Sequence, residues 1–257
     1  MKIVVKMRGT CGELAQGFYR GEPVLITCPI EKFSTAIVSD EFAGVFDLGS
    51  KSQAILDKVC GGREFKFGLR LTSELPRGKG MASSSADMAA VAQAVALSLG
   101  RRLSPDELGK LCASIEPTDG IFYPGVVAMN PLTGRLIKNI RAQERFQVAV
   151  FDYGGEVDTL KLNRRSDFEF PTLTDEIDFT LTERSALANQ SILPKRGLED
   201  LMTFARDLGA VAVNVAHSGT VAGIFFRADD SYAAKKVAAV RRRFDFLDFM
   251  TLTRLAV

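Results

Sequence analysis

Residues 73–90, which read SELPRGKGMASSSADMAA, constrain the fold more than any other stretch of the chain. Gly78 and Gly80 permit positive φ and a close approach of the backbone to a ligand. Three serines follow at 83–85, where we expect them to cap a new helix. Because the free N–H groups and the dipole at a helix start both attract anions, the stretch predicts a phosphate-binding loop that leads into a helix.

The helix expected after this loop is rich in alanine. Few side chains from Ala86 to Leu99 are large, so the helix backbone can pack closely against its neighbours. Gly100 is placed to end the helix, since glycine readily adopts the left-handed conformation found after helix C-termini. We therefore predict a buried, rigid helix behind the loop.

Two commoner glycine-rich motifs do not match this stretch. A P-loop reads G-x-x-x-x-G-K-[ST], whereas Lys79 is followed by Gly80 rather than by a hydroxyl residue. A dinucleotide-binding fingerprint needs a third glycine where Ser83 stands. The stretch therefore fits neither class of nucleotide-binding protein.

Composition narrows the kind of protein further. The chain has 257 residues, enough for one large or two modest domains, with 46% hydrophobic and 25% charged residues. A net charge of +2 argues against a nucleic-acid-binding surface. A single histidine and four cysteines without a C-x-x-C pair leave no zinc motif. With no signal peptide or membrane-spanning run recognisable in the sequence, we expect a soluble cytoplasmic protein with reduced thiols that binds neither nucleic acid nor membrane.

The order of the expected elements favours an α+β protein with two domains. The first domain, residues 1–150, is expected to hold the glycine-rich loop, a helix from Ser104 to Ser114 with Pro105 at its start, and strands at 2–8, 23–30, 33–39, 64–71, 126–130, 134–140 and 146–152. Residues 9–17 are expected to be rich in turns, and the polar segment 154–176 is expected to cross into the second domain. That domain, residues 151–257, is predicted to pack helices near 177–191, 197–208 and 231–242 on a sheet with strands at 210–215, 224–227 and 247–252.

The loop resembles the second motif of the GHMP kinases (galactose, homoserine, mevalonate and phosphomevalonate kinases), P-x-x-x-G-[LM]-x-S-S-[AS]. The matching residues are Pro76, Gly80, Met81, Ser83, Ser84 and Ser85. The segment AHSGTVAG at 216–223 resembles the third motif, with Gly219 and Gly223 retained. GTCGELAQG at 9–17 takes the place of the first motif but departs from its P-G-K type turn, and it looks like the branch of bacterial L-threonine kinases that make threonine phosphate for the cobalamin side chain.

The resemblance covers nearly the whole chain and implies a GHMP kinase fold, with a ribosomal-S5-like N-terminal domain and a ferredoxin-like C-terminal domain. It also implies a kinase that uses ATP and Mg²⁺ to phosphorylate the side-chain hydroxyl of L-threonine. Phosphoryl transfer needs backbone donors, a cation and a metal ion near the phosphates. The expected ATP-binding residues are Pro76, Arg77, Gly78, Lys79, Gly80, Met81, Ala82, Ser83, Ser84 and Ser85.

The resemblance assigns the remaining site residues as well. It gives Ser84 and Glu116 to Mg²⁺, which prefers hard oxygen ligands, and it makes Asp119 the general base for the substrate hydroxyl. For a substrate with an ammonium and a carboxylate, we expect Glu13 to meet the ammonium. The other expected substrate contacts are Gln16, Thr118, Tyr123, His217, Ser218 and Gly219.

Three alternatives stay open at this point. The acceptor could be another small hydroxyl metabolite, such as homoserine or an isoprenoid alcohol. The chain could be a regulatory protein that binds ATP without catalysis, although the presence of both Glu116 and Asp119 argues against it. A nucleic-acid-binding module built on the S5-like fold is disfavoured by the balanced charge.

Overall fold

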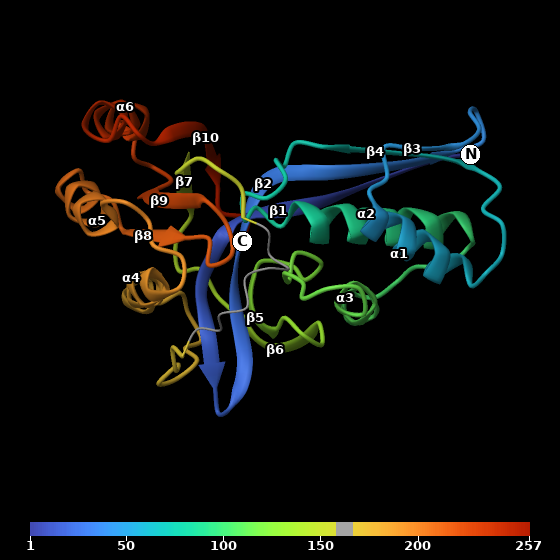
Figure 1. Cartoon of the computed structure of the whole chain (residues 1–257), viewed down its shortest axis with the longest axis horizontal. Coiled ribbons are helices and arrows are strands. Elements are labelled where there is room, and N and C mark those ends of the chain that lie inside the picture. Colours follow the sequence, from blue (N-terminus) through green and yellow to red (C-terminus); the bar gives the residue numbers. More distant parts are fainter. Residues whose placement is uncertain (158–166) are drawn as a thin grey trace.

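Two long antiparallel strands run through the centre of the computed structural model, which describes residues 1–157 and 167–257 (Figure 1). They are β1 (Lys2–Tyr19) and β2 (Glu22–Ser39), and they pair along their whole length. The pairing register shifts three times between Arg8 and Ala15, where bulges absorb extra residues. The prediction that residues 9–17 are rich in turns is therefore wrong, because these residues continue β1. The strand is irregular here, with bulges and with Gly12 at φ +55°.

All the other strands join this hairpin directly or through a neighbour. The order in the described sheet is β10-β7-β9-β8-β1-β2-β4-β3, and β5 pairs with both β2 and β6. These strands are β3 (Val45–Phe46), β4 (Gly68–Ser73), β5 (Val126–Asn130), β6 (Arg135–Ile140), β7 (Phe146–Asp152), β8 (Ala212–Val215), β9 (Val221–Arg227) and β10 (Asp248–Arg254).

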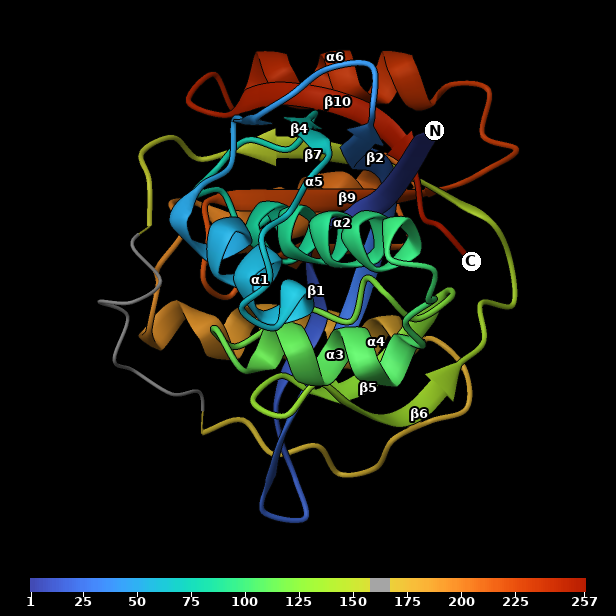
Figure 2. The ribbon, with the colours of Figure 1, turned by 90° about the vertical axis from the view of Figure 1, so that its right-hand side faces the viewer.

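The helices form two groups beside the sheet. In Figure 2, α2 lies in the middle of the first group with α1 and α3 beside it. The second group contacts the strands of the C-terminal half, α4 and α5 against β8 and α6 against β10. The bounds are α1 (Ser50–Cys60), α2 (Ser83–Ser98), α3 (Pro105–Ala113), α4 (Phe179–Ala188), a 3₁₀ turn η1 (Asn189–Ser191), α5 (Leu198–Asp207) and α6 (Ala233–Arg243).

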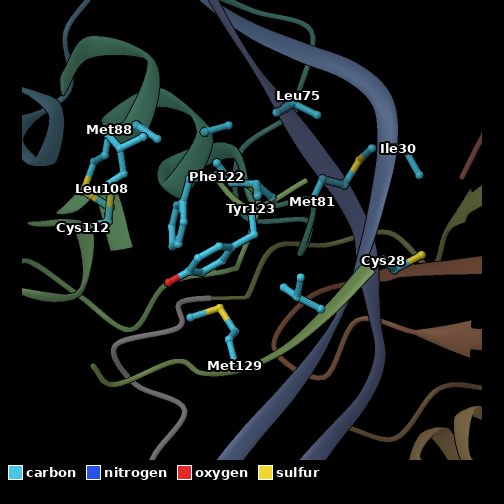
Figure 3. Close-up of a cluster of buried hydrophobic side chains, with 14 of the residues drawn as sticks. Cys28, Ile30, Leu75, Met81, Met88, Leu108, Cys112, Phe122, Tyr123 and Met129 are labelled. Atoms are coloured by element: carbon cyan, nitrogen blue, oxygen red, sulfur yellow. The ribbon is translucent and has the colours of Figure 1, made fainter. Parts of the chain in front are cut away.

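The alanine-rich helix α2 is buried almost throughout, as predicted. Its small side chains let it contact β1, β2, α1 and α3 at once, and Gly100 at φ +80° follows its end. Met88 of α2 belongs to one buried cluster with Leu108 and Cys112 of α3 (Figure 3). This packing fixes the start of α2 relative to the chain that leaves α3.

Helix α3 also begins as predicted. The Ser104 side chain accepts a hydrogen bond from the backbone N–H of Glu107, and the Glu107 carboxylate accepts one from the N–H of Ser104. This capping box satisfies two N–H groups at the helix start. One other prediction needs correction: the strand expected at 64–71 occupies Gly68–Ser73. The sequence analysis did not predict α1.

The α+β class is confirmed, and the predicted division at residue 150 stays a prediction. Strand β7 pairs with β9 and β10, so a boundary between residues 150 and 151 falls inside a strand of the C-terminal half of the sheet. A second buried cluster gathers around Phe151, Leu201 and Phe226. Of the predicted crossing segment 154–176, residues 158–166 lie outside the described residues. In the part of the chain that the structure describes, no helix is long and apolar enough to cross a membrane.

We predict that Gly109→Ala loosens the packing of α3. A Cβ at Gly109 would lie 2.4 Å from the carbonyl oxygen of Gly134 and 2.9 Å from the Phe122 ring. Because the first contact is with backbone, the free energy of unfolding should fall by about 1–3 kcal/mol. Urea denaturation measures it, with Lys110→Ala at an exposed position of the same helix as control. Equal stability of the two variants would contradict the close packing.

Candidate active site

A cavity of about 610 Å³ lies where the start of α2 meets β1, the start of α1, the chain after α3 and the C-terminal half. Most of the residues predicted for the site line it. From the phosphate loop these are Arg77, Gly78, Gly80, Met81, Ala82, Ser83, Ser84 and Ser85, and from elsewhere Glu13, Gln16, Glu116, Asp119, His217 and Ser218. Chain segments more than 200 residues apart in sequence thus form one wall.

The phosphate loop is held by its own carbonyl groups. The carbonyl of Gly80 accepts from Gly12 N at 3.0 Å, and that of Met81 accepts from Thr10 N at 3.1 Å. The carbonyl of Lys79 accepts from the N–H groups of Thr220 and Val221. The loop is therefore fastened to β1 on one side and to the residues after His217 on the other.

Two glycines in these contacts have no room for a side chain. Gly80, at φ +79°, would place a Cβ 2.4 Å from that of Ala216. A Cβ on Gly219 would lie 2.3 Å from the carbonyl oxygen of Lys79. The glycines that resemble the second and third motifs therefore allow two loops to touch, and Gly219 shapes the site through the backbone without lining the cavity.

The three serines do not cap α2 as predicted. The N-cap residue is Ala82, at φ +55°, and no side chain in the described residues caps the helix. Ser84 and Ser85 stand in the first turn, where their hydroxyls bind carboxylates instead. The start of α2 at the cavity, which is the positive end of the helix dipole, therefore has no side-chain cap. Such a helix start is suited to binding an anion.

Glu116 lies next to this first turn. Its carboxylate accepts hydrogen bonds from the Ser84 hydroxyl and from the ammonium group of Lys51, which stands at the start of α1. The adjacent hydroxyl and carboxylate oxygens are the hard ligands that suit Mg²⁺. No group of three or more His, Cys, Asp or Glu side chains that could hold a metal occurs among residues 1–157 and 167–257. A magnesium ion here would take its other ligands from phosphate and water.

Asp119 is held by the next serine along the helix. The Ser85 hydroxyl lies 3.3 Å from Asp119 Oδ2 and also accepts from Asp119 N at 3.2 Å and from Thr118 Oγ1 at 3.1 Å. Burial raises the pKa of Asp119 to about 7, and the negative charge of Glu13 adds to the shift. A carboxyl group with a pKa near neutrality is suited to exchange a proton with a bound hydroxyl.

Glu13 and His217 form a buried polar chain in the wall of the cavity. Glu13 Oε2 accepts from His217 N at 2.8 Å and lies 3.1 Å from His217 Nδ1. The second ring nitrogen, Nε2, lies 2.9 Å from the Ser185 hydroxyl on α4. Among residues 1–157 and 167–257, the hydrogen bonds of the Glu13 carboxylate all use Oε2, so Oε1 keeps its lone pairs for a ligand.

Four predicted residues besides Gly219 do not line the cavity. Pro76 stands one residue before the first lining residue of the loop, Arg77. Thr118 reaches the site only through its hydrogen bond to the Ser85 hydroxyl. Lys79 forms an ion pair with Asp152 at 2.7 Å and donates to Gly155 O, so its charge is already neutralised. Tyr123 lies in the core (Figure 3), where its hydroxyl donates to Asp106 at 2.7 Å. We therefore remove Tyr123 from the substrate contacts.

Sequence reasoning missed several polar groups at the site. Lys51 and Asp87 line the cavity, and the buried carboxylate of Asp87 accepts from the Ser34 hydroxyl. Asn189 also lines it, and Lys195 is buried nearby with Nζ donating to Ala216 O at 2.9 Å. None of them lies in a recognised motif. The sequence offers little to mark Lys51, which is the second residue of α1, because α1 itself was not predicted.

Comparison with known proteins gives consistent matches. Residues 51–123 match the family described as GHMP kinases N terminal domain. The chain is 30% identical to an L-threonine kinase of Citrobacter freundii over 86% of this chain and 85% of that one. It is 27% identical to an L-threonine kinase of Salmonella typhimurium over 86% and 82%.

Solved structures share the fold. The mevalonate kinase of Methanococcus jannaschii superimposes with a TM-score of 0.70 at 14% identity, over 100% of this chain and 99% of that one. A homoserine kinase from Cytophaga hutchinsonii gives 0.64 at 16% identity, over 97% and 95%. The fold expected from the three motifs is confirmed.

Glu13→Gln should lower the pKa of Asp119, because the neutral amide removes a negative charge that raises it. The matched change Glu116→Gln should lower this pKa less, since Glu116 raises it less than Glu13 does. Titration of the Asp119 side-chain ¹³C signal measures both shifts. If Glu116→Gln lowered the pKa of Asp119 more than Glu13→Gln does, Glu116 and not Glu13 would be the stronger charge on Asp119, which would contradict the account.

Proposed function

Given that this chain belongs to the GHMP kinase family and is an ATP-dependent small-molecule kinase, we propose that its acceptor is L-threonine. The product is O-phospho-L-threonine, which we assign to cobalamin biosynthesis in the cytoplasm. Two curated relatives carry the name L-threonine kinase. The four free, buried thiols fit the reducing cytoplasm.

One observation carries the mechanism: consecutive serines in the first turn of α2 hold the two carboxylates. Ser84 binds Glu116 and Ser85 binds Asp119. Any anion at this helix start therefore lies beside both acids. Transfer of a phosphoryl group depends on positioning and on stabilising the charge of its oxygens, and this arrangement supplies a place for both.

In the proposed complex the phosphates of ATP lie against the first turn of α2. The uncapped N–H groups and the helix dipole bind their oxygens. Arg77 lines the same cavity and contributes positive charge, whereas the charge of Lys51 is paired with Glu116. Ser84 and Glu116 would hold Mg²⁺, which neutralises charge on the phosphate oxygens when it is bound.

Asp119 accepts the proton as the threonine hydroxyl oxygen bonds to the γ-phosphorus and the bond to the ADP oxygen breaks. The free oxygen of Glu13 faces the ammonium group of the substrate, and His217 holds Glu13 in place. Gln16 and Ser218 also line the cavity, where they help to orient the amino acid.

We expect Asp119→Asn to lower kcat by roughly 10²–10⁴-fold, because the amide does not take up a proton. The affinity for ATP should stay unchanged, since Asp119 meets the acceptor. Wild-type activity should fall as pH drops below about 7, where Asp119 becomes protonated, and the residual activity of the variant should lose this dependence. Steady-state kinetics across pH measure it; unchanged turnover would remove the base role.

A panel of acceptors separates the proposal from its closest alternatives. With ADP release as readout, L-threonine should be used at least about tenfold more efficiently than L-homoserine or mevalonate, because each 1.4 kcal/mol of transition-state binding gives a factor of ten. The opposite ranking would assign another acceptor to the same fold. ATP binding in calorimetry with no turnover of any acceptor would instead favour a regulatory protein.

A further inference from the structure

The only histidine of the chain is held by side chains from β1 and from α4. His217 Nδ1 lies 3.1 Å from Glu13 Oε2 on β1, and Nε2 lies 2.9 Å from the Ser185 hydroxyl on α4. All three side chains are buried. Because both ring nitrogens meet a polar group, the position of the ring proton decides what each contact can do.

A hydroxyl, an imidazole and a carboxylate in this order also form the catalytic triad of many hydrolases. In such a triad the serine oxygen attacks the substrate, so it must be open to it. Ser185 is 1% exposed and does not line the cavity, and its hydroxyl already accepts from Gln16 N at 3.0 Å. The arrangement therefore supplies no nucleophile, and Ser185 can affect the cavity only through its partners.

The contacts of the ring favour one tautomer. A proton on Nδ1 lets the ring donate to Glu13 Oε2, whereas an unprotonated Nδ1 would set its lone pair against the carboxylate oxygen. Nε2 of the neutral ring then needs a donor, which the Ser185 hydroxyl can supply. That hydroxyl has one proton and two possible acceptors, Nε2 at 2.9 Å and Gln16 O at 3.3 Å, and the shorter contact is to Nε2.

A second proton on the ring is disfavoured by a buried cation nearby. The Lys195 ammonium donates to the carbonyl of Ala216, the residue before His217, at 2.9 Å. A charged ring would add a further buried positive charge to the same few residues, which is costly. The neutral ring with its proton on Nδ1 therefore fits these surroundings.

A fixed ring also fixes the Glu13 carboxylate. Oε2 accepts from the backbone N–H of His217 at 2.8 Å and from its ring at 3.1 Å. Oε1 has no hydrogen-bond partner among residues 1–157 and 167–257, and it is not one of the covered polar atoms that lack a partner there. Because Glu13 lines the cavity, Oε1 opens on it. The ring thus holds one carboxylate oxygen while the other meets the cavity.

We propose that Ser185 is a positioning residue of the kinase: its hydroxyl donates to His217 Nε2 and keeps the ring proton on Nδ1, which holds Glu13 with Oε1 toward the substrate ammonium. The inference rests on the proposed function, because it gives Glu13 the ammonium of an amino acid. It adds a residue of α4, outside the three motifs, that acts on the substrate without touching it.

The first test reads the ring directly. Because the chain has one histidine, ¹⁵N-labelled histidine in a protein without a histidine tag gives the NMR signals of a single ring. Correlations to the carbon-bound ring protons show which nitrogen carries the proton. We expect Nδ1 protonated and Nε2 unprotonated in the wild-type enzyme, and a mixture of ring forms in Ser185→Ala, because Nε2 loses its donor. A wild-type ring protonated on Nε2, or a Ser185→Ala ring identical to wild type, would overturn the proposal.

The second test is a double-mutant cycle in kcat/KM for L-threonine, which shows whether Ser185 acts through Glu13. Ser185→Ala should lower kcat/KM roughly 3- to 30-fold, mostly through KM, because Glu13 then meets the ammonium less well. In the Glu13→Gln background the same change should cost less than about twofold, since the charge that Ser185 positions is already absent. Equal losses in both backgrounds would show a purely structural effect and contradict the positioning role.

Thr182→Val is the matched control. It removes another buried hydroxyl of α4, one that donates to Asp178 O at 3.1 Å, and it should lower stability without changing the ring form or the kinetics. Ser185→Cys keeps the size of the side chain with a weaker donor, so it should lie between wild type and Ser185→Ala in both tests. The cysteine variant carries the comparison if Ser185→Ala does not fold.

The outcomes separate the positioning role from the proposed function. The histidine spectrum needs no substrate, so a wrong ring form would overturn the role of Ser185 while wild-type turnover of L-threonine upholds the proposed function. Failure of the wild-type enzyme to use L-threonine would overturn the proposed function, and with it the assignment of Glu13 to the ammonium. The expected ring form together with a loss that vanishes in Glu13→Gln supports both.

Discussion

The pairing of two neighbouring serines with two carboxylates is the interaction on which the whole site depends. Ser84 and Ser85 are adjacent in the first turn of α2, and Glu116 and Asp119 follow α3 three residues apart. Since the serine hydroxyls bind the carboxylates, the start of α2 has no side-chain cap among the described residues, which leaves its N–H groups available to an anion. The acids and the anion site therefore share one helical turn, which suits a reaction that needs both.

The rest of the fold keeps this turn in place. Small side chains along α2 bring it against the central hairpin and α3, and the Gly109–Gly134 contact brings α3 close to the turn between β5 and β6. The loop before α2 is fastened through its carbonyl groups to β1 and to the residues after His217. The C-terminal half then closes the cavity with Asn189, His217 and Ser218. A site assembled from such distant segments requires rigid contacts between backbones, which explains why glycines occupy the crossing points.

The loop before α2, the end of α2 and the start of α3 could be predicted from the sequence, because a few neighbouring residues determine each of them. The glycines before α2, the serine and proline at the start of α3, and Gly100 each act within a few residues, and the structure has them as expected. Predictions failed where long-range packing decides the outcome. Residues 9–17 look like a turn, but pairing with β2 and β8 keeps them in a strand. The serines look like caps until the carboxylates that bind them come into view. Lys51 and Asn189 had no motif to mark them, since only the tertiary fold brings them to the cavity.

The most direct test of the account is a crystal structure of the enzyme with Mg²⁺, a non-hydrolysable ATP analogue and L-threonine. The account predicts the γ-phosphate at the first turn of α2, with the threonine hydroxyl within hydrogen-bonding distance of Asp119 and between that carboxylate and the phosphorus. A triphosphate bound away from Ser83–Ser85, or a threonine whose hydroxyl points away from Asp119, would contradict it.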